Sequence, residues 1–206
     1  MTVPVRSLSL RAWLAVITLS LTGAPDAPGA RELGAPRDVR ATVRLSRSAG
    51  LPEGWPDVYG LAVRWSSGAR DQDVLLASSG LGRYARYLLT VRRSPLAARY
   101  STLMPFRGDD GPVLLAAVAH PSDRWASRRD LTGTEPLTFE LLSSRPGGDW
   151  HHLGMLTTDR VEVDHDEALR FDPLAHCPAG LRTYLWTALL RRPSYVAARL
   201  AWRGTR

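Results

Sequence analysis

Histidines and carboxylates gather in one stretch of the chain, residues 150–167, where they could hold a metal ion. Its histidines and carboxylates are His151, His152, Asp159, Glu162, Asp164, His165, Asp166 and Glu167. Imidazole and carboxylate together suit Zn, Mn or Fe, and a metal-bound hydroxide can attack a phosphodiester. Adjacent strand residues point to opposite faces, so at most one of His151 and His152 joins such a cluster. No known metal-ligand spacing is present. We therefore prefer a solvated hairpin rim, predict no metal site, and keep a metal-dependent phosphodiesterase as an alternative.

Arginine and tyrosine are interleaved in a second stretch, residues 82–100, where they could contact nucleic acid. The members are Arg83, Tyr84, Arg86, Tyr87, Arg92, Arg93, Arg99 and Tyr100. Guanidinium groups grip phosphates, and tyrosine rings stack on bases. However, all 27 Lys+Arg residues of this +7 chain are arginine, which is therefore its general surface cation. Solvated arginine stems covering a core explain the stretch better. We expect no nucleic-acid partner and keep a nucleic-acid-contacting or structural module as a further alternative.

Two smaller features have structural explanations. Cys177 is the only cysteine, so no internal disulfide and no cysteine-rich metal site can form. No nucleophile motif surrounds it, and we expect a small packing residue. The acidic pair in residues 108–111, Gly-Asp-Asp-Gly, is typical of a hairpin turn rather than of a pair of metal ligands.

The elements that must position these residues are short strands. In residues 38–47, Val39, Ala41, Val43 and Leu45 alternate with polar side chains, which is the period of a half-buried strand. The same reasoning predicts strands at 58–66 and 73–79, hairpins of 99–107 with 112–120 and of 137–144 with 150–158, and a short edge strand at 160–165. Many short strands between Gly/Pro/Asp turns favour an antiparallel barrel or sandwich.

The C-terminal end has a helical pattern. Residues 179–192 place Leu181, Leu185 and Leu189 at helical spacing, Pro193 ends that helix, and a second amphipathic helix follows it. The predicted fold class is therefore α+β: a mainly antiparallel β-barrel with C-terminal helices, forming one domain over residues 38–206.

The N-terminal end, residues 1–37, combines a signal-like segment with a linker rich in Pro, Gly and Ala. Arg6 and Arg11 precede the apolar run 12–21, and small residues follow it. If residues 6–24 act as a signal, the protein is exported; otherwise it is cytoplasmic. Membrane contact is expected only through this segment, if it is retained. The run also suits a strand or a helix, and these alternatives remain open.

Residues 44–80 resemble the barrel segment of the haem-dependent catalases. That segment carries an Arg-Phe-Ser strand end, an Arg-Asp-x-x-Gly-Phe-Ala-x-Lys-Phe strand and an Asp-Leu-Val strand. The matching positions are Arg44, Ser46, Asp57, Gly60, Ala62, Arg64, Trp65, Asp73, Val74 and Leu75. In addition, "YSTLMPFR" at 100–107 and "LRFDP" at 169–173 resemble a group of catalase-fold proteins from high-GC bacteria, some of them labelled phosphodiesterases. The likeness covers residues 38–200.

The resemblance implies a catalase-like barrel with a pocket for haem or another flat small-molecule ligand. By the same resemblance, Arg44, Arg64 and Arg191 would pair with haem propionates and Tyr195 would ligate the iron. One departure matters: catalases need a distal histidine before the Arg-Phe-Ser element, and this chain has no histidine before His120. Without that imidazole no group moves the peroxide proton. We therefore expect haem binding without catalase turnover.

Overall fold

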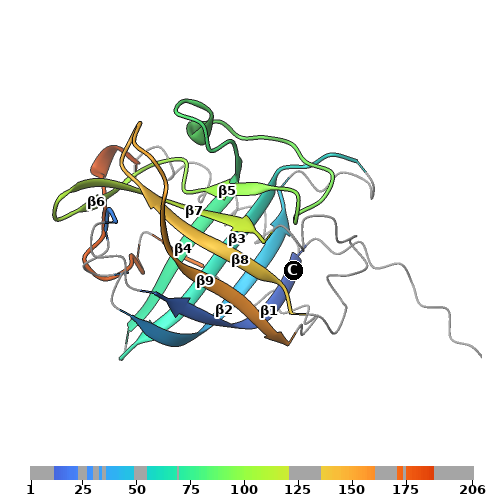
Figure 1. The fold of residues 1–206 in the computed structure, drawn as a ribbon, viewed down its shortest axis with the longest axis horizontal. Helices are drawn as coiled ribbons and strands as arrows, with labels where there is room; N and C mark the ends of the chain where they lie inside the picture. The colour runs from blue at the N-terminus through green and yellow to red at the C-terminus, as the bar shows by residue number, and fades with distance from the viewer. Residues whose placement is uncertain are drawn as a thin grey trace, which may run out of the picture.

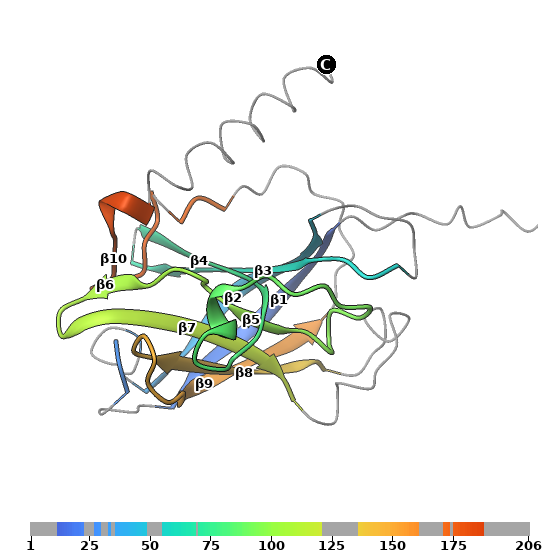
Figure 2. The ribbon, with the colours of Figure 1, turned by 90° about the horizontal axis from the view of Figure 1, so that it is seen from above.

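One antiparallel sheet dominates the computed structural model (Figures 1 and 2). The structure describes residues 12–22, 27–29, 33, 36–48, 55–68, 70–120, 136–160, 171–173 and 175–187. The elements are β1 (Ala12–Leu21), β2 (Arg37–Arg47), β3 (Tyr59–Ser67), β4 (Arg70–Ser79), the 3-10 helix η1 (Ala85–Tyr87), β5 (Arg99–Ser101), β6 (Phe106–Gly108), β7 (Gly111–Ala119), β8 (Thr138–Ser144), β9 (His151–Arg160) and β10 (Arg182–Thr183).

The sheet closes on itself. Its strands follow the order β7-β5-β4-β3-β2-β1-β9-β8, and a further pairing of β7 with β8 joins the two ends. Within the described residues this makes an antiparallel barrel of eight strands, which confirms the predicted barrel. β6 pairs with the start of β7, and β10 pairs with β6, so these two short strands extend the sheet beyond the barrel.

The alternating pattern of the sequence explains which side chains fill the barrel. On β3, Leu61, Val63 and Trp65 are buried at 4% exposure or less, while the residues between them point outward. The core also takes Ile17 from β1 and Phe139 from β8. Fully burying a side chain of this size contributes about 1.5–3 kcal/mol, so closure of the barrel is driven by its interior.

The barrel interior is filled rather than hollow. A cavity of about 10 Å³ remains there, enough for roughly one water molecule. Its walls are apolar and consist of Leu19, Leu33, Val63, Trp65, Val74, Leu115, Leu141 and Leu156. A cavity of this size holds no flat ligand, so such a ligand would have to bind on the outside of the barrel.

The apolar run in the signal-like segment forms β1. Its backbone pairs with β2 from Ala12 to Leu21 and with β9 from Val16 to Leu21. Ile17 and Leu19 face the core at 1% exposure or less. Of the open alternatives for residues 12–21, the structure shows the strand. The predicted boundary between residues 37 and 38 lies at the start of β2, which pairs with β1. The export of residues 6–24 stays a prediction.

The predicted C-terminal helices are not confirmed. Arg182 and Thr183 form β10, and of the described residues of the predicted helix, 179–187, only 185–187 are helical. The predicted second helix lies outside the described residues. The helical spacing predicted that Leu181 and Leu185 lie on one helix face, but Leu181 is buried in the core whereas Leu185 is 85% exposed. These leucines therefore do not share one buried helix face. No helix in the described ranges is long and apolar enough to cross a membrane.

The first predicted hairpin is confirmed in outline but not in detail. The strand expected at 99–107 is divided into β5 and β6, although both still pair with β7. The break occurs at Leu103, whose φ of 57° is a left-handed conformation rarely adopted by strand residues. The Gly-Asp-Asp-Gly turn joins β6 to β7, as predicted.

Candidate functional site

Seven of the ten residues that carry the catalase resemblance lie side by side on the outside of three neighbouring strands, whereas Trp65 and Val74 face the core and Asp57 precedes β3. Because β2, β3 and β4 each send alternate residues into the core, the remaining residues form an outer surface. The strand register aligns them in three rows. We call this surface the β2–β4 outer face; its rows are Thr42–Arg64–Asp73, Arg44–Ala62–Leu75 and Ser46–Gly60–Ala77.

A buried ion pair anchors one end of this face. The Arg64 guanidinium donates from Nε to Asp73 Oδ1 and from Nη2 to Asp73 Oδ2, both at 2.6 Å. Asp73 is fully buried, and the Arg64 side chain is 16% exposed. The hydrogen bond to Asp73 raises the pKa of Arg64, as do the charges of Asp73 and Asp71, while burial opposes the rise. The pair is thus a fixed, two-pronged contact.

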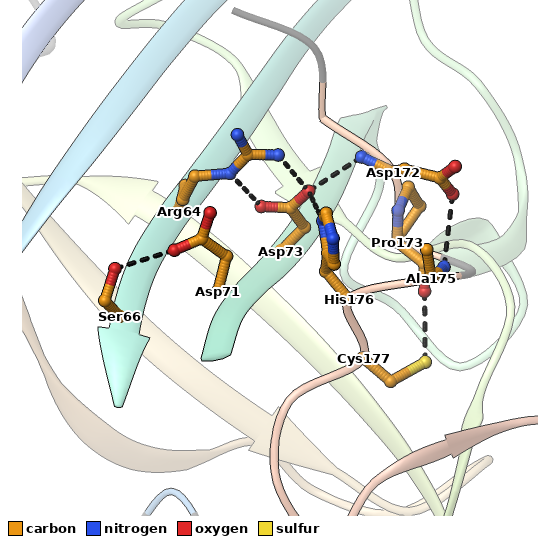
Figure 3. A network of polar contacts seen from close by, with 9 residues as sticks. All are labelled: Arg64, Ser66, Asp71, Asp73, Asp172, Pro173, Ala175, His176 and Cys177. Atoms are coloured by element: carbon orange, nitrogen blue, oxygen red, sulfur yellow. Dashed lines mark hydrogen bonds and ion pairs between the residues drawn. The ribbon is translucent and has the colours of Figure 1, made fainter. Parts of the chain in front are cut away.

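Asp73 also fastens a distant segment, residues 171–179, onto the barrel (Figure 3). Its Oδ2 accepts from the backbone N of Asp172 at 2.7 Å and lies 3.3 Å from His176 Nδ1. In the reverse direction, the backbone N of Asp73 donates to the His176 carbonyl at 2.6 Å. The Arg64 guanidinium stacks on the Phe171 ring at 5.0 Å. One carboxylate therefore connects β3, β4 and the segment that crosses them.

His176 contributes a partly exposed imidazole to this site, and the sequence analysis did not identify it. Its side chain is 40% exposed, and Asp73 holds one ring nitrogen. A carboxylate at Nδ1 favours the tautomer with hydrogen on that nitrogen, which leaves Nε2 as an acceptor. The two residues are 103 positions apart, and no local motif connects them.

Cys177 is a packing residue in the same segment. Its Sγ lies 3.0 Å from the carbonyl oxygen of Pro173 and 3.0 Å from Thr183 Oγ1. The thiol is partly buried against the core. These contacts hold the turn that leads into β10.

Arg44 is the arginine of the β2–β4 outer face that forms no ion pair with another described residue. It is half-buried, and in the described ranges its guanidinium has no hydrogen-bond or ion-pair partner. Its row neighbour on β3 is the small residue Ala62. In the next row a Cβ on Gly60 would lie 2.8 Å from Ser46 Oγ, so glycine there makes room for the Ser46 side chain. A cation beside small side chains suits the acidic edge of a flat ligand.

These residues fit one part of the predicted haem site. Arg44 is available for a propionate, whereas Arg64, also predicted to bind one, already gives two donors to Asp73. Arg191 and Tyr195, the other two predicted residues, lie outside the described residues. The described residues therefore fit the carboxylate edge of haem, and they do not place its axial ligand.

The His/acid stretch is described only in its first half. His151 and His152 lie at the start of β9 and are both exposed, with His152 Nδ1 3.0 Å from Glu140 Oε1. Among described residues, no group of three or more His, Cys, Asp or Glu could hold a metal. Residues 161–167 lie outside the described ranges, so a metal-dependent phosphodiesterase stays a prediction.

The Arg/Tyr stretch is divided by the fold. Tyr100 is fully buried in the core, and its hydroxyl donates to the Pro95 carbonyl at 2.6 Å. Arg86 is also buried. The exposed members are Arg83, Tyr84, Tyr87, Arg92, Arg93 and Arg99. The stretch is thus part interior and part surface, and the solvated covering of a core by its exposed arginines stays a prediction.

Comparison with known proteins supports the fold. No family model and no curated protein sequence matches the chain. Among solved structures, a fungal catalase is similar with a TM-score of 0.65 at 10% identity, and a bacterial catalase with a TM-score of 0.59 at 11% identity. Each match covers 88% of this chain and 56% of the catalase, so the chain spans about half the length of these catalases. The fold is catalase-like, as the resemblance predicted; at this identity the likeness shows the fold alone.

Proposed function

We propose that the β2–β4 outer face binds haem, or a similar flat ligand with carboxylates, and that the protein does not dismutate hydrogen peroxide. The observation that supports this most is the half-buried Arg44, which lacks a partner among the described residues and lies beside the small residues Ala62 and Gly60. The catalase-like fold makes haem the first ligand to test.

Each residue of the face has a separate task in this proposal. Arg44 pairs with a ligand carboxylate, and the small side chain of Ala62 lets the ring plane approach the strands. The Arg64–Asp73 pair keeps β3, β4 and residues 171–179 in place around the ligand. Tyr195 is the proposed iron ligand, and Arg191 a second propionate partner. When bound, haem would supply redox chemistry at its iron.

The absence of peroxide dismutation follows from the positions of the histidines. The chain has no histidine before His120, so the early strands offer no imidazole to move the peroxide proton. His176 has one ring nitrogen held by Asp73 and belongs to a different part of the chain. The proposal is therefore a ligand-binding catalase-like barrel.

Haem titration of the purified chain, followed by absorption, tests the proposal. We expect a saturable Soret band that shifts in Tyr195→Phe. Arg44→Ala should weaken haem binding about tenfold or more, the cost of one charge-assisted hydrogen bond. Arg40→Ala is the matched control, since Arg40 is an exposed arginine of the same strand. The affinity of this variant for haem should equal that of the parent chain.

Three results would contradict the proposal. A featureless spectrum at every haem concentration excludes haem, and equal losses in Arg44→Ala and Arg40→Ala exclude the β2–β4 outer face. Peroxide consumption by the haem-loaded protein above that of free haem would contradict the expected lack of dismutation. Substoichiometric metal in dialysed protein would end the phosphodiesterase alternative.

A further inference from the structure

An unusual group of exposed apolar side chains surrounds η1. Eight large hydrophobic side chains are exposed in the described part of the chain, and five of them lie within residues 84–91. These five are Tyr84, Tyr87, Leu88, Leu89 and Val91, at exposures from 38% to 76%. Scattered exposed hydrophobics are ordinary, but a contiguous apolar patch marks an interaction surface. We call residues 83–93 the 83–93 loop.

The charge around this loop is mainly positive. Residues 74–108 contain no aspartate or glutamate. Within them Arg83, Arg92, Arg93, Arg99 and Arg107 are all exposed. The adjoining turn, residues 145–149, adds one exposed residue of each sign, Arg145 and Asp149. A partner of the loop must therefore accept apolar side chains and carry negative charge.

The loop is held in place by a buried arginine. Arg86 donates to Ser144 Oγ at 2.9 Å and to the Gly148 carbonyl at 2.9 Å, and its guanidinium lies over the Trp150 ring at 4.7 Å. Further Arg86 donors reach the carbonyls of Leu81, Gly82 and Arg145. In Figure 1 the loop with η1 projects from one end of the barrel. Because its backbone is anchored, its apolar side chains cannot turn inward without breaking these contacts.

We propose that the 83–93 loop docks onto the surface of an anionic lipid bilayer. Leu88, Leu89 and Val91 enter the boundary between headgroups and acyl chains, Tyr84 and Tyr87 lie at headgroup level, and the arginines contact lipid phosphates. Nucleic acid fits less well, because single strands are bound by aromatic stacking, and aliphatic side chains give no stacking platform. A second copy of this chain fits less well, because the same arginines would face one another across a two-fold interface.

Vesicle co-sedimentation of the full chain tests this inference. The probes are vesicles of phosphatidylcholine with phosphatidylglycerol, and vesicles of phosphatidylcholine alone. We expect binding to the mixed vesicles that falls with added salt, because the arginine–phosphate contacts are screened. The double variant Leu88→Asp/Leu89→Asp should lower this binding about tenfold or more. Both leucines are exposed, so circular dichroism should show unchanged folding.

A matched control separates the loop from general exposed hydrophobicity. Leu185 is a leucine exposed at 85% beyond β10, outside the loop, and Leu185→Asp should leave vesicle binding unchanged. Equal losses in the two variants, equal binding to both vesicle types, or no binding to either would overturn the inference. The inference would also be overturned if the loop variant kept vesicle binding but lost binding to a single-stranded oligonucleotide. The same holds if it kept vesicle binding but lost a concentration-dependent dimer. Haem titration tests the β2–β4 outer face and vesicle binding tests the 83–93 loop, so either proposal can fail without the other.

Discussion

The Asp73 side chain has several polar partners from distant parts of the chain, which its local sequence does not indicate. Its side chain accepts from Arg64 and from the backbone of Asp172, and it lies beside His176. A fully buried carboxylate is tolerated only when such partners replace its hydration. Removing either Asp73 or Arg64 therefore leaves the other charge buried without its partner, and the free energy of unfolding should fall by the cost of burying that charge.

A double-mutant cycle measures this cost. Asp73→Leu should lower the free energy of unfolding by about 3 kcal/mol, because Arg64 is left without its carboxylate in a mostly buried position. The double variant Arg64→Met/Asp73→Leu should lose less than the sum of the two single variants. Urea unfolding monitored by circular dichroism gives the four values.

The control for this cycle is Asp71→Ala on the same strand. Asp71 is exposed and accepts from Ser66 Oγ at 2.7 Å, so its loss should cost no more than about 0.5 kcal/mol. A loss from Asp73→Leu as small as that from Asp71→Ala would show that the ion pair does not anchor the segment.

Tyr100 gives the protein a pH dependence at alkaline pH. Burial raises the pKa of Tyr100 well above its ordinary value, and the charge of Tyr59 adds to the rise. The unfolded chain ionises this tyrosine above about pH 10, whereas the folded protein keeps the proton. Between these two pKa values the free energy of unfolding should therefore fall by about 1.4 kcal/mol per pH unit.

Tyr100→Phe should remove that part of the alkaline slope, and below pH 9 its only cost should be the hydrogen bond to Pro95. Urea unfolding from about pH 8 to about pH 11 measures both effects. Tyr84→Phe, at an exposed position, should keep the slope of the parent chain. An identical alkaline slope for Tyr100→Phe and the parent would refute this origin.

At the scale of elements, β1 and β9 are held by an unusually close backbone approach. The register of β9 with β8 shifts between Leu141 and Leu142. At Gly154 a Cβ would lie 2.2 Å from the backbone oxygen of Ser20 on β1. Only glycine permits this approach, and the sequence alone does not show which strand comes so near.

Gly154→Ala tests this contact. The added methyl group should push β9 from β1 and lower the free energy of unfolding by about 3 kcal/mol. Amide hydrogen exchange should increase in β1 and β9 before other strands. Gly82→Ala is the control, since a Cβ there would meet its nearest neighbour at 3.9 Å. Similar stability of the two variants would argue against the pairing of these strands.

Local patterns predicted β2, β3 and β4 as single strands and placed their ends within three residues. Strands expected at 38–47, 58–66 and 73–79 are found as Arg37–Arg47, Tyr59–Ser67 and Arg70–Ser79. In these strands one face is buried, and the period of two records it. The C-terminal pattern failed because apolar spacing does not distinguish a helix face from a chain that buries one leucine and exposes the next.

At the scale of the whole molecule, β1 closes the barrel. Without it, β2 and β9 would become unpaired edges, which are prone to associate with other chains. A chain of residues 25–206 should therefore lose cooperative thermal unfolding and self-associate, whereas a chain of residues 11–206 should behave like the parent. Circular dichroism melts and size-exclusion chromatography compare the three, and a cooperative melt of 25–206 at the parent temperature would contradict the role of β1.

The sequence by itself determined the strand-rich chain from Asp38, its two hairpins, and the inward and outward faces of β2, β3 and β4. These properties follow from local alternation, since each residue contributes its own polarity. The resemblance on residues 44–80 added the catalase-like barrel. The run 12–21 is apolar from Ala12 to Ile17 and alternates only over its last few residues, so the sequence left it open as signal, strand or helix.

Only the tertiary structure decided the pairings of β1 with β9 and of β7 with β8, the joining of Asp73 to His176, and the burial of Arg86. Each connects segments far apart along the chain. Their geometry follows from closing one sheet around a filled interior, because closure fixes the register of distant strands at once. No local pattern carries that constraint, so residues with the same sequence signature become a buried anchor at Arg86 and an exposed surface at Arg83.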